Sequence, residues 1–452
     1  MSAVIIFASC LGNNDDDYIY YGDMSIQSFT LGTLNCYLTS KASDGTDSTY
    51  KETVKGSDYK FFIDQINHEI YNPDSLPFGT DAKHVICTIT SKNSGGIGIK
   101  SLISDTVFVY NSTDSIDFSS PRHVMIYAMD GSGVRDYTVR VNVHQEKEGE
   151  LRWTAKNVFE AFQPMTDMKA VVCGERLYVA GTDGTTESIY STALTDGDTW
   201  TAATPDIALP AGFWQNVITD GQYIYALNGS NLVRSTDGNH WDEVGAADVQ
   251  RLAGAADGML YGLTADGIMC SPDGTSWTAS AIDDSQALLP VRDLSLCTEP
   301  LKTDPGISRL LLTGNRSEAD YPNDQYSASW VRITTDETSP WMFCTAEPSN
   351  HKLPRQNHLA VIKYCDGFLA LGAEGIGYGW RPFTQFYYTL DCGLNWITDS
   401  RFVLPEGFSC NSAFAMTVDA DHFIWIVTSG SGQVWRGRLN DLGWDTIQRE
   451  FK

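Results

Sequence analysis

A repeated unit in the C-terminal two thirds of the chain constrains the fold most. A turn followed by an apolar strand recurs as CGERLYVAG, TDGQYIYALN, ADGMLYGLT, CDGFLALGA and ADHFIWIVT, with GISRLLLTG as a weaker sixth copy. Six copies between residues 151 and 452 give about 50 residues per repeat, a length typical of propeller blades with four antiparallel strands. The repeat predicts a six-bladed β-propeller. Seven blades would require the long stretch from Ala279 to Phe343 to contain another blade.

A second turn, which ends in Trp, follows four of these strands as TDGDTW, STDGNHW, SPDGTSW and TLDCGLNW. Its Asp can accept backbone N–H bonds within the turn, and its Gly can take a positive φ without steric cost. Its Trp is large enough to fill the wedge between neighbouring blades. A catalytic Asp would not recur in register in several blades, so we interpret these residues as scaffold. They are Asp237, Gly238 and Trp241; Asp273, Gly274 and Trp277; and Asp391, Gly393 and Trp396.

The pattern S/T-x-D-[x]-G-x-x-W resembles the Asp-box, or BNR repeat, of sialidase-type propellers, and TLDCGLNW fits its longer form best. In families with this motif the turns lie on the rim away from the ligand, so the resemblance implies a fold and no activity. Sialidases also resemble one another in an R-I-P motif, an Arg triad and a Tyr–Glu pair. The chain has no R-I-P, although some of its residues could serve the other roles. These are Arg251, Arg292, Arg355 and Arg381 for the triad, and Tyr378 or Tyr326 with Glu374 or Glu318 for the pair.

The segment before the propeller is a separate domain in our interpretation. Residues 20–145 contain HVICTITS, DTVFVYNS, RHVMIYAMD and DYTVRVNVH, which are strand-like by their alternation and their β-branched or aromatic content. MDGSGVRDY reads as a hairpin turn between two of these strands. We predict a β-sandwich here. Its closing YTVRVNV is similar to the last strand of Ig-like domains, and the charged residues 146–150 form a linker to the propeller at 151–452.

Residues 1–19 resemble a lipoprotein signal segment followed by an acidic tether. AVIIFAS is an apolar run that is too short to span a bilayer, and it ends in small residues directly before Cys10. FAS-C is similar to a bacterial lipobox, which implies a lipid on Cys10. The run GNNDDD resembles a surface-export signal of Bacteroidetes lipoproteins, and this implies an outer-membrane lipoprotein exposed at the cell surface. The alternative is an ordinary buried strand.

Charge and cysteine usage exclude some partners. The net charge of −26 argues against nucleic acid and against anionic membrane surfaces, so the predicted membrane contact is the lipid anchor alone. The cysteines show no C-x-x-C and no Cys/His spacing, so we expect no metal and no cofactor. Cys36 and Cys87 could pair in an oxidising compartment, or remain buried thiols. We expect a monomer.

The candidate ligand site is the mouth of the propeller channel. Polar residues just before each inner strand should ring it: Lys169, Gln215, Asn216, Gln250, Arg251, Arg292, Asp293, Asn357, His358, Asn411 and Ser412. Two long loops, 314–330 and 372–388, add aromatic and charged side chains. The aromatic rings can stack on sugar rings, and the charged groups can form paired hydrogen bonds with the hydroxyl or acid groups of a sugar. They contribute Tyr321, Asp324, Tyr326, Tyr378, Trp380, Arg381 and Phe383, and Trp214 lies near another strand start. The same aromatic residues could instead brace the loops.

The order of parts resembles an uncharacterised Bacteroidetes surface lipoprotein family with an N-terminal Ig-like β-domain and a C-terminal BNR/Asp-box (sialidase-like) β-propeller. That resemblance implies a surface protein that binds a glycan or glycoprotein at the channel mouth without catalysis. Two alternatives remain. One is a sialidase-like glycoside hydrolase, and the other is a protein-docking platform in a surface complex. No G-x-S-x-G, H-E-x-x-H or phosphate-cradling loop supports another enzyme class.

Overall fold

The computed structural model describes residues 20–41, 46–336, 338–344, 351–375 and 381–444. The chain divides into two units, Met1–Glu148 with Trp444–Lys452, and Gly149–Gly443. The predicted linker 146–150 spans this division. Trp444 falls within the stretch predicted as propeller, but it belongs to the N-terminal unit, where its ring stacks on that of His144 at 3.9 Å. Cys10 lies outside the described residues.

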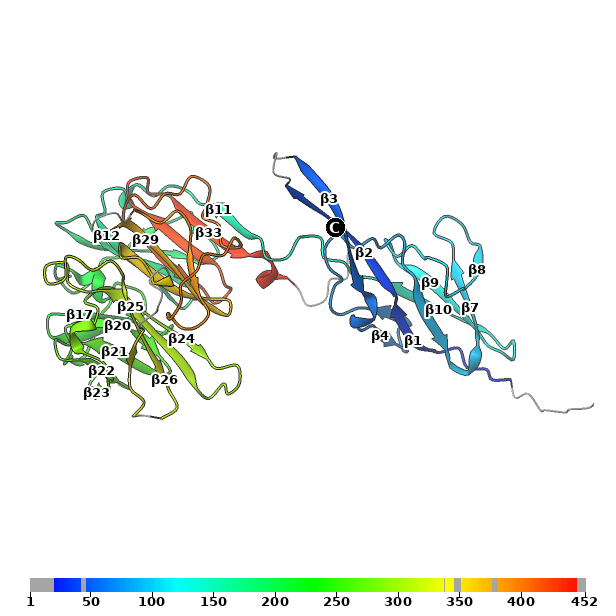
Figure 1. Cartoon of the computed structure of the whole chain (residues 1–452), viewed down its shortest axis with the longest axis horizontal. Coiled ribbons are helices and arrows are strands. Elements are labelled where there is room, and N and C mark those ends of the chain that lie inside the picture. The colour runs from blue at the N-terminus through cyan, green and yellow to red at the C-terminus, as the bar shows by residue number, and fades with distance from the viewer. Residues whose placement is uncertain (1–19, 42–45, 337, 345–350, 376–380, 445–452) are drawn as a thin grey trace, which may run out of the picture. The chain divides into compact units, whose positions relative to one another are not determined.

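The N-terminal unit is built from strands, as predicted (Figure 1). Each of the four segments predicted as strands contains or overlaps a strand of the structure. The predicted turn at 129–137 joins two of these strands as a hairpin. One sheet pairs β1 (Ile26–Leu31) with β6 (Cys87–Ser91), and a hairpin pairs β2 (Thr33–Lys41) with β3 (Asp47–Lys55). The six-stranded sheet runs β4 (Phe62–Asp64), β5 (Glu69–Tyr71), β10 (Val134–Arg140), β9 (Arg122–Tyr127), β7 (Gly96–Lys100) and β8 (Val107–Val109). Short 3-10 turns lie at Gly56–Asp58 and Lys92–Ser94.

The core of this unit lies between the β1–β6 pair and the six-stranded sheet. Phe29 from β1 shares one buried cluster with Val124 from β9 and Tyr137 from β10, because alternate residues of each strand face inward. Cys36 and Cys87 are both free thiols and both buried, and burial raises the pKa of Cys87 to about 12. The structure therefore shows the unpaired form of these two cysteines.

The described residues of the C-terminal unit form six sheets, five with four strands and one with three. The first three are β12 (Asp167–Cys173), β13 (Arg176–Thr182), β14 (Glu187–Ala193) and β15 (Thr201–Ala202); β16 (Ile218–Thr219), β17 (Ile224–Asn228), β18 (Asn231–Ser235) and β19 (Asp242–Ala246); and β20 (Arg251–Ala256), β21 (Met259–Leu263), β22 (Ile268–Ser271) and β23 (Thr278–Ser280). The next two are β24 (Arg292–Pro300), β25 (Ser308–Asn315), β26 (Ala328–Ile333) and β27 (Met342–Phe343); and β28 (Gln356–Tyr364), β29 (Gly367–Gly375) and β30 (Tyr387–Thr389). The sixth holds β31 (Phe414–Val418), β32 (Ile424–Thr428), β33 (Val434–Leu439) and β11 (Leu151–Ala155). Short 3-10 turns include η3 (Glu160–Phe162), η4 (Phe213–Asn216), η5 (Gln286–Leu288) and η7 (Asn440–Gly443).

The first strands of the six sheets contact one another in a ring. β12 contacts β16, β16 contacts β20, and the contacts continue through β24, β28 and β31 back to β12. This is the arrangement of a β-propeller, with each sheet extending outward from a central channel. The all-β class and the propeller expected from the repeat are therefore present.

The two ends of the C-terminal unit share one sheet. β11 pairs antiparallel with β33, so the first strand of the C-terminal unit completes the sheet that holds its last three strands. The pairing is visible in Figure 1, where β11 lies beside β33. The indole of Trp153 also donates a 2.8 Å hydrogen bond to the carbonyl of Val403. This pairing covers the edges that an open array of sheets would expose.

Among the described residues, no helix is long and apolar enough to cross a bilayer.

Candidate functional site

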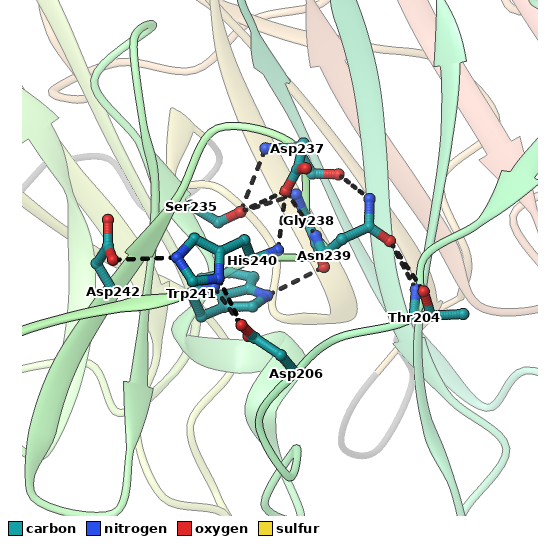
Figure 2. Close-up of polar contacts among 9 residues, drawn as sticks. All are labelled: Thr204, Asp206, Ser235, Asp237, Gly238, Asn239, His240, Trp241 and Asp242. Atoms are coloured by element: carbon teal, nitrogen blue, oxygen red, sulfur yellow. Dashed lines mark hydrogen bonds and ion pairs between the residues drawn. The ribbon is translucent and has the colours of Figure 1, made fainter.

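The Asp/Gly turn between β18 and β19 is held by its own side chains (Figure 2). Ser235 Oγ donates to Asp237 Oδ1 at 3.2 Å and accepts the amide of Gly238 at 2.8 Å. Asp237 Oδ1 also accepts the amides of Asn239 at 2.8 Å and His240 at 3.0 Å. Gly238 has φ of 77°, a conformation that a side chain would oppose. The carboxylate of Asp237 is thus occupied by bonds within its own turn.

Trp241, which ends this turn, packs against the neighbouring sheet. Its Nε1 donates to the carbonyl of Gly238 at 3.0 Å, and its ring meets Phe213 edge-on at 5.5 Å. It shares a buried cluster with Val171 and Tyr178 of the preceding sheet, and Tyr178 donates its hydroxyl to the carbonyl of Thr236 at 3.1 Å. The turn therefore joins two adjacent sheets.

The two other complete copies repeat the Asp and Gly geometry, while the indole bond recurs at Trp277 and Trp396 Nε1 has no hydrogen-bond partner among the described residues. Asp273 Oδ1 accepts the amides of Thr275 and Ser276 at 2.8 Å each, and these bonds hold the pKa of Asp273 well below its usual range. Asp391 Oδ1 accepts the hydroxyl of Thr389 at 2.9 Å and the amide of Asn395 at 2.8 Å. Gly274 and Gly393 both have positive φ, Trp277 Nε1 bonds to the carbonyl of Gly274 at 3.1 Å, and Trp396 is buried.

Strand register shows which end of a sheet these turns occupy. Thr219, at the end of β16, pairs with Ile224 of β17, and Ile224 pairs with Ser235, where the turn begins. The turn therefore lies at the end of the sheet where the inner strand finishes. A ligand site at the starts of the inner strands lies at the other end.

A cavity of about 180 Å³ lies in the central channel and is lined by residues of all six sheets, mainly from their first strands. Its polar lining includes six of the residues that the sequence places before the inner strands: Lys169, Gln215, Arg251, Arg292, Asp293 and His358. These come from four different sheets and the η4 turn, so the phase of the repeat brings them together. Asn216 and Asn357 do not line this cavity.

Two of the lining residues lie on distorted backbone. Asp293 has φ of 53° and His358 has φ of 51°, values that are uncommon for residues with a side chain. Each lies where the pairing register shifts, in β24 between Arg292 and Ser295 and in β28 between Asn357 and Ala360. Such bulges redirect side chains and are concentrated near functional sites.

His358 connects carboxylates on both sides of its ring. Its Nδ1 is 3.5 Å from Asp167 Oδ1 of β12, and its Nε2 is 3.8 Å from Glu374 Oε2 of β29. Glu374 also has a positive φ, 52°. Asp167 was not selected from the sequence, although it precedes Lys169 by two positions and therefore shares a strand face with it.

Burial changes the acidity of two lining groups. Desolvation raises the pKa of Asp293, while a 2.8 Å hydrogen bond from Asn315 Nδ2 opposes that rise. Desolvation lowers the pKa of Lys169 to about 8, and the nearby Asp293 limits the drop. The ammonium of Lys169 donates a long 3.5 Å bond to the carbonyl of Gln215. The channel mouth thus holds a cation whose charge is lost above about pH 8 and a carboxyl group whose ionisation burial opposes.

A second cavity, of about 300 Å³, shares Trp214, Gln215 and Arg292 with the first. It is also lined by Asp167 and Glu187. Burial raises the pKa of Glu187, whose Oε1 accepts the amide of Gly212 at 2.8 Å. The two cavities therefore adjoin each other.

The long loop between β25 and β26 is braced by its own residues. Arg316 donates two hydrogen bonds to the carboxylate of Asp324, at 2.7 and 2.5 Å. Its guanidinium lies over the ring of Tyr321, 3.8 Å from the ring centre. Arg355, almost fully buried, donates to the carbonyls of Tyr321 at 2.8 Å and Arg316 at 3.0 Å. The predicted ligand residues Tyr321 and Asp324 therefore have structural partners, and Arg355 does not line the channel cavity.

Other predicted ligand residues are also engaged in the fold. Phe383 and Trp214 are buried, and the ring of Phe383 packs on Tyr387 at 4.5 Å. Asn216 Oδ1 accepts the amide of Leu252 at 3.0 Å, which joins the second sheet to the third. The carbonyl of Arg381 accepts Gln356 Nε2 at 2.9 Å. Tyr326 forms a bridge with Pro354, while Tyr378 and Trp380 lie outside the described residues.

The family of the chain follows from comparison with domain models. The DUF6242 beta propeller domain matches residues 147–447, and the DUF6242 N-terminal domain, a domain of unknown function, matches residues 29–141. The chain belongs to the DUF6242 family. No curated protein matches it. Among its described residues, no group of three or more His, Cys, Asp or Glu side chains could hold a metal ion.

Solved structures resemble the chain at low sequence identity. A calcium structure of a Trichoderma reesei carbohydrate-active enzyme of family AA12 is 10% identical, covering 64% of this chain and 95% of that one, with a TM-score of 0.38. The endo-arabinase from Bacteroides thetaiotaomicron is 11% identical over 63% of this chain and 95% of that one, with a TM-score of 0.31. The N-terminal domain of Nup159 is 12% identical over 65% and 96%, with a TM-score of 0.32.

Proposed function

We propose that the chain is a cell-surface binding protein that holds a glycan, or the glycan of a glycoprotein, at the channel mouth without catalysis. In this proposal the six sheets are the blades of a six-bladed propeller with Asp-box turns, and the N-terminal unit is an Ig-like sandwich that acts as a spacer. A lipid on Cys10 anchors the protein to the outer membrane of a Bacteroidetes cell.

The observation that carries this proposal is the pair of bulged residues at the mouth. Asp293 and His358 lie on left-handed backbone at the starts of two neighbouring inner strands, and both line the channel cavity. The cost of such a conformation is of order 1–3 kcal/mol, and it persists where the surrounding structure enforces it, often at ligand sites. A bulge that only ended a strand would not need to present polar side chains to a shared cavity.

The chemistry of the mouth suits a polyhydroxylated ligand. Lys169, Arg251 and Arg292 supply donors, while Asp167 and Glu374 supply acceptors. Sugar hydroxyls both donate and accept, so a site with both kinds of group can satisfy them. A sialidase-like site is less well supported because Arg355 is committed to loop carbonyls, and a protein-docking platform would not need a channel cavity.

A glycan array probed with the full chain tests the proposal. We expect binding to a limited group of glycans, and we expect His358→Gln to reduce it by roughly tenfold, the effect of losing one hydrogen bond to the ligand. His240→Gln is the matched control, because His240 is exposed in the turn at the other end of its sheet. A blank array together with a protein partner captured at the mouth would replace the glycan proposal with the docking platform. Release of sialic acid from sialosides would contradict binding without catalysis.

A further inference from the structure

The charge of the channel cavity differs from that of the whole protein. The chain carries a net charge of −26, yet three cations line the cavity: Lys169 from β12, Arg251 from β20 and Arg292 from β24. Within the described residues, none of the three forms an ion pair with a carboxylate. Cations placed together in an acidic protein without ion-pair partners provide a local site for an anion.

The same cavity is also lined by the carboxyl group of Asp293, whose surroundings favour its neutral form. Asp293 is half-buried, desolvation raises its pKa, and Asn315 donates one hydrogen bond to it. The nearby Asp167 and Glu374 face the two nitrogens of His358, at 3.5 and 3.8 Å. Two carboxylates of the mouth are thus placed against a histidine, and burial works against the negative charge of the third, Asp293.

We propose that the channel mouth binds the carboxylate of an acidic sugar, with Lys169, Arg251 and Arg292 as its partners. This inference rests on the proposed glycan-binding function and names the class of glycan. A guanidinium presents paired N–H donors that match the two oxygens of a carboxylate, and an ammonium adds a compact charge. The adjoining second cavity, which shares Arg292, has room for the rest of the glycan.

The affinity of such a site should fall as the pH rises. The charged groups around Lys169 are Asp167 on its own strand, Arg251 on β20, Arg292 and Asp293 on β24, His358 on β28 and Glu374 on β29. Burial lowers the pKa of Lys169 to about 8, so its positive charge is present below that pH and is lost above it. The loss of this charge weakens the binding of an anion at alkaline pH.

Calorimetric titration of the full chain with matched acidic and neutral sugars tests the inference. The pairs are sialyllactose with lactose, and trigalacturonate with its methyl ester. We expect at least one acid to bind about tenfold tighter than its neutral partner at pH 6.5, and to lose most of that advantage at pH 9.5. Lys169→Met should reduce the affinity for the acid by about tenfold.

The control variant is Lys302→Met, because Lys302 lies just beyond the other end of β24 and pairs with Asp366 on the surface. It should leave the affinity unchanged, and urea unfolding of both variants checks that they are folded. Equal binding of the acid and its neutral partner, unaffected by Lys169→Met, would overturn the carboxylate inference and leave the glycan proposal standing. Failure of every sugar on the glycan array would instead remove the proposed function itself.

Discussion

Replacing Trp241 with Ala is expected to lower the free energy of unfolding of the C-terminal unit by about 3–5 kcal/mol, the range for removing a buried aromatic side chain. Trp241 is only 5% exposed and lies in a cluster drawn from two sheets. Its loss leaves a cavity at the junction of these sheets and removes the indole bond to Gly238. Urea unfolding followed by Trp fluorescence measures this, because every Trp except Trp444 falls within Gly149–Gly443.

Trp241→Phe is the informative control for this prediction. It retains an aromatic ring beside Phe213 but removes the hydrogen bond to Gly238, so it should be clearly less destabilising than Ala. If Trp241→Ala changed stability by less than about 1 kcal/mol, Trp241 would not be a wedge between sheets.

Gly437→Ala is expected to destabilise the C-terminal unit by about 1–3 kcal/mol, a typical result of overpacking. Gly437 of β33 pairs directly with Trp153 of β11, and a methyl group there would lie 2.3 Å from the Trp153 ring. To relieve the clash, Trp153 must move and weaken its hydrogen bond to Val403. The same urea titration reports the change.

The matched control is Gly267→Ala, because a methyl group at Gly267 meets no atom within 4 Å. This substitution should leave stability nearly unchanged. Equal stability of the two alanine variants would mean that the pairing of β11 with β33 contributes little to holding the ends of the unit together.

The features that could be predicted from the sequence are those set by local physics. The bonds of the turn from Ser235 to Trp241 lie within a few residues, so its pattern alone indicated a scaffold role. The repeat also gave the phase of the inner strands, and this placed Lys169, Arg251, Arg292 and His358 at the channel. Neither result depended on knowing which sheets are neighbours.

The features that could not be predicted depend on distant partners or on backbone distortion. The sequence left open whether Tyr321 meets a ligand or braces its loop, and the partner that decides this, Arg355, is more than 30 positions away and binds the carbonyls of Tyr321 and Asp324. The bulges that place Asp293 and His358 on left-handed backbone have no signature in alternating strand sequences. Glu374 becomes a neighbour of His358 when β28 pairs with β29, whereas Asp167 of β12 does so only after the sheets form a ring.

The central claim separates two roles, with scaffold at the Asp turns and ligand binding at the channel mouth. Measuring both the urea midpoint and the affinity for one array-selected glycan, in Asp237→Ala and in His358→Gln, tests this most directly. Asp237→Ala should lower stability by about 1–2 kcal/mol through lost turn bonds and leave affinity unchanged, whereas His358→Gln should lower affinity and leave stability nearly unchanged. The opposite pattern, with affinity lost in Asp237→Ala and retained in His358→Gln, would contradict the account.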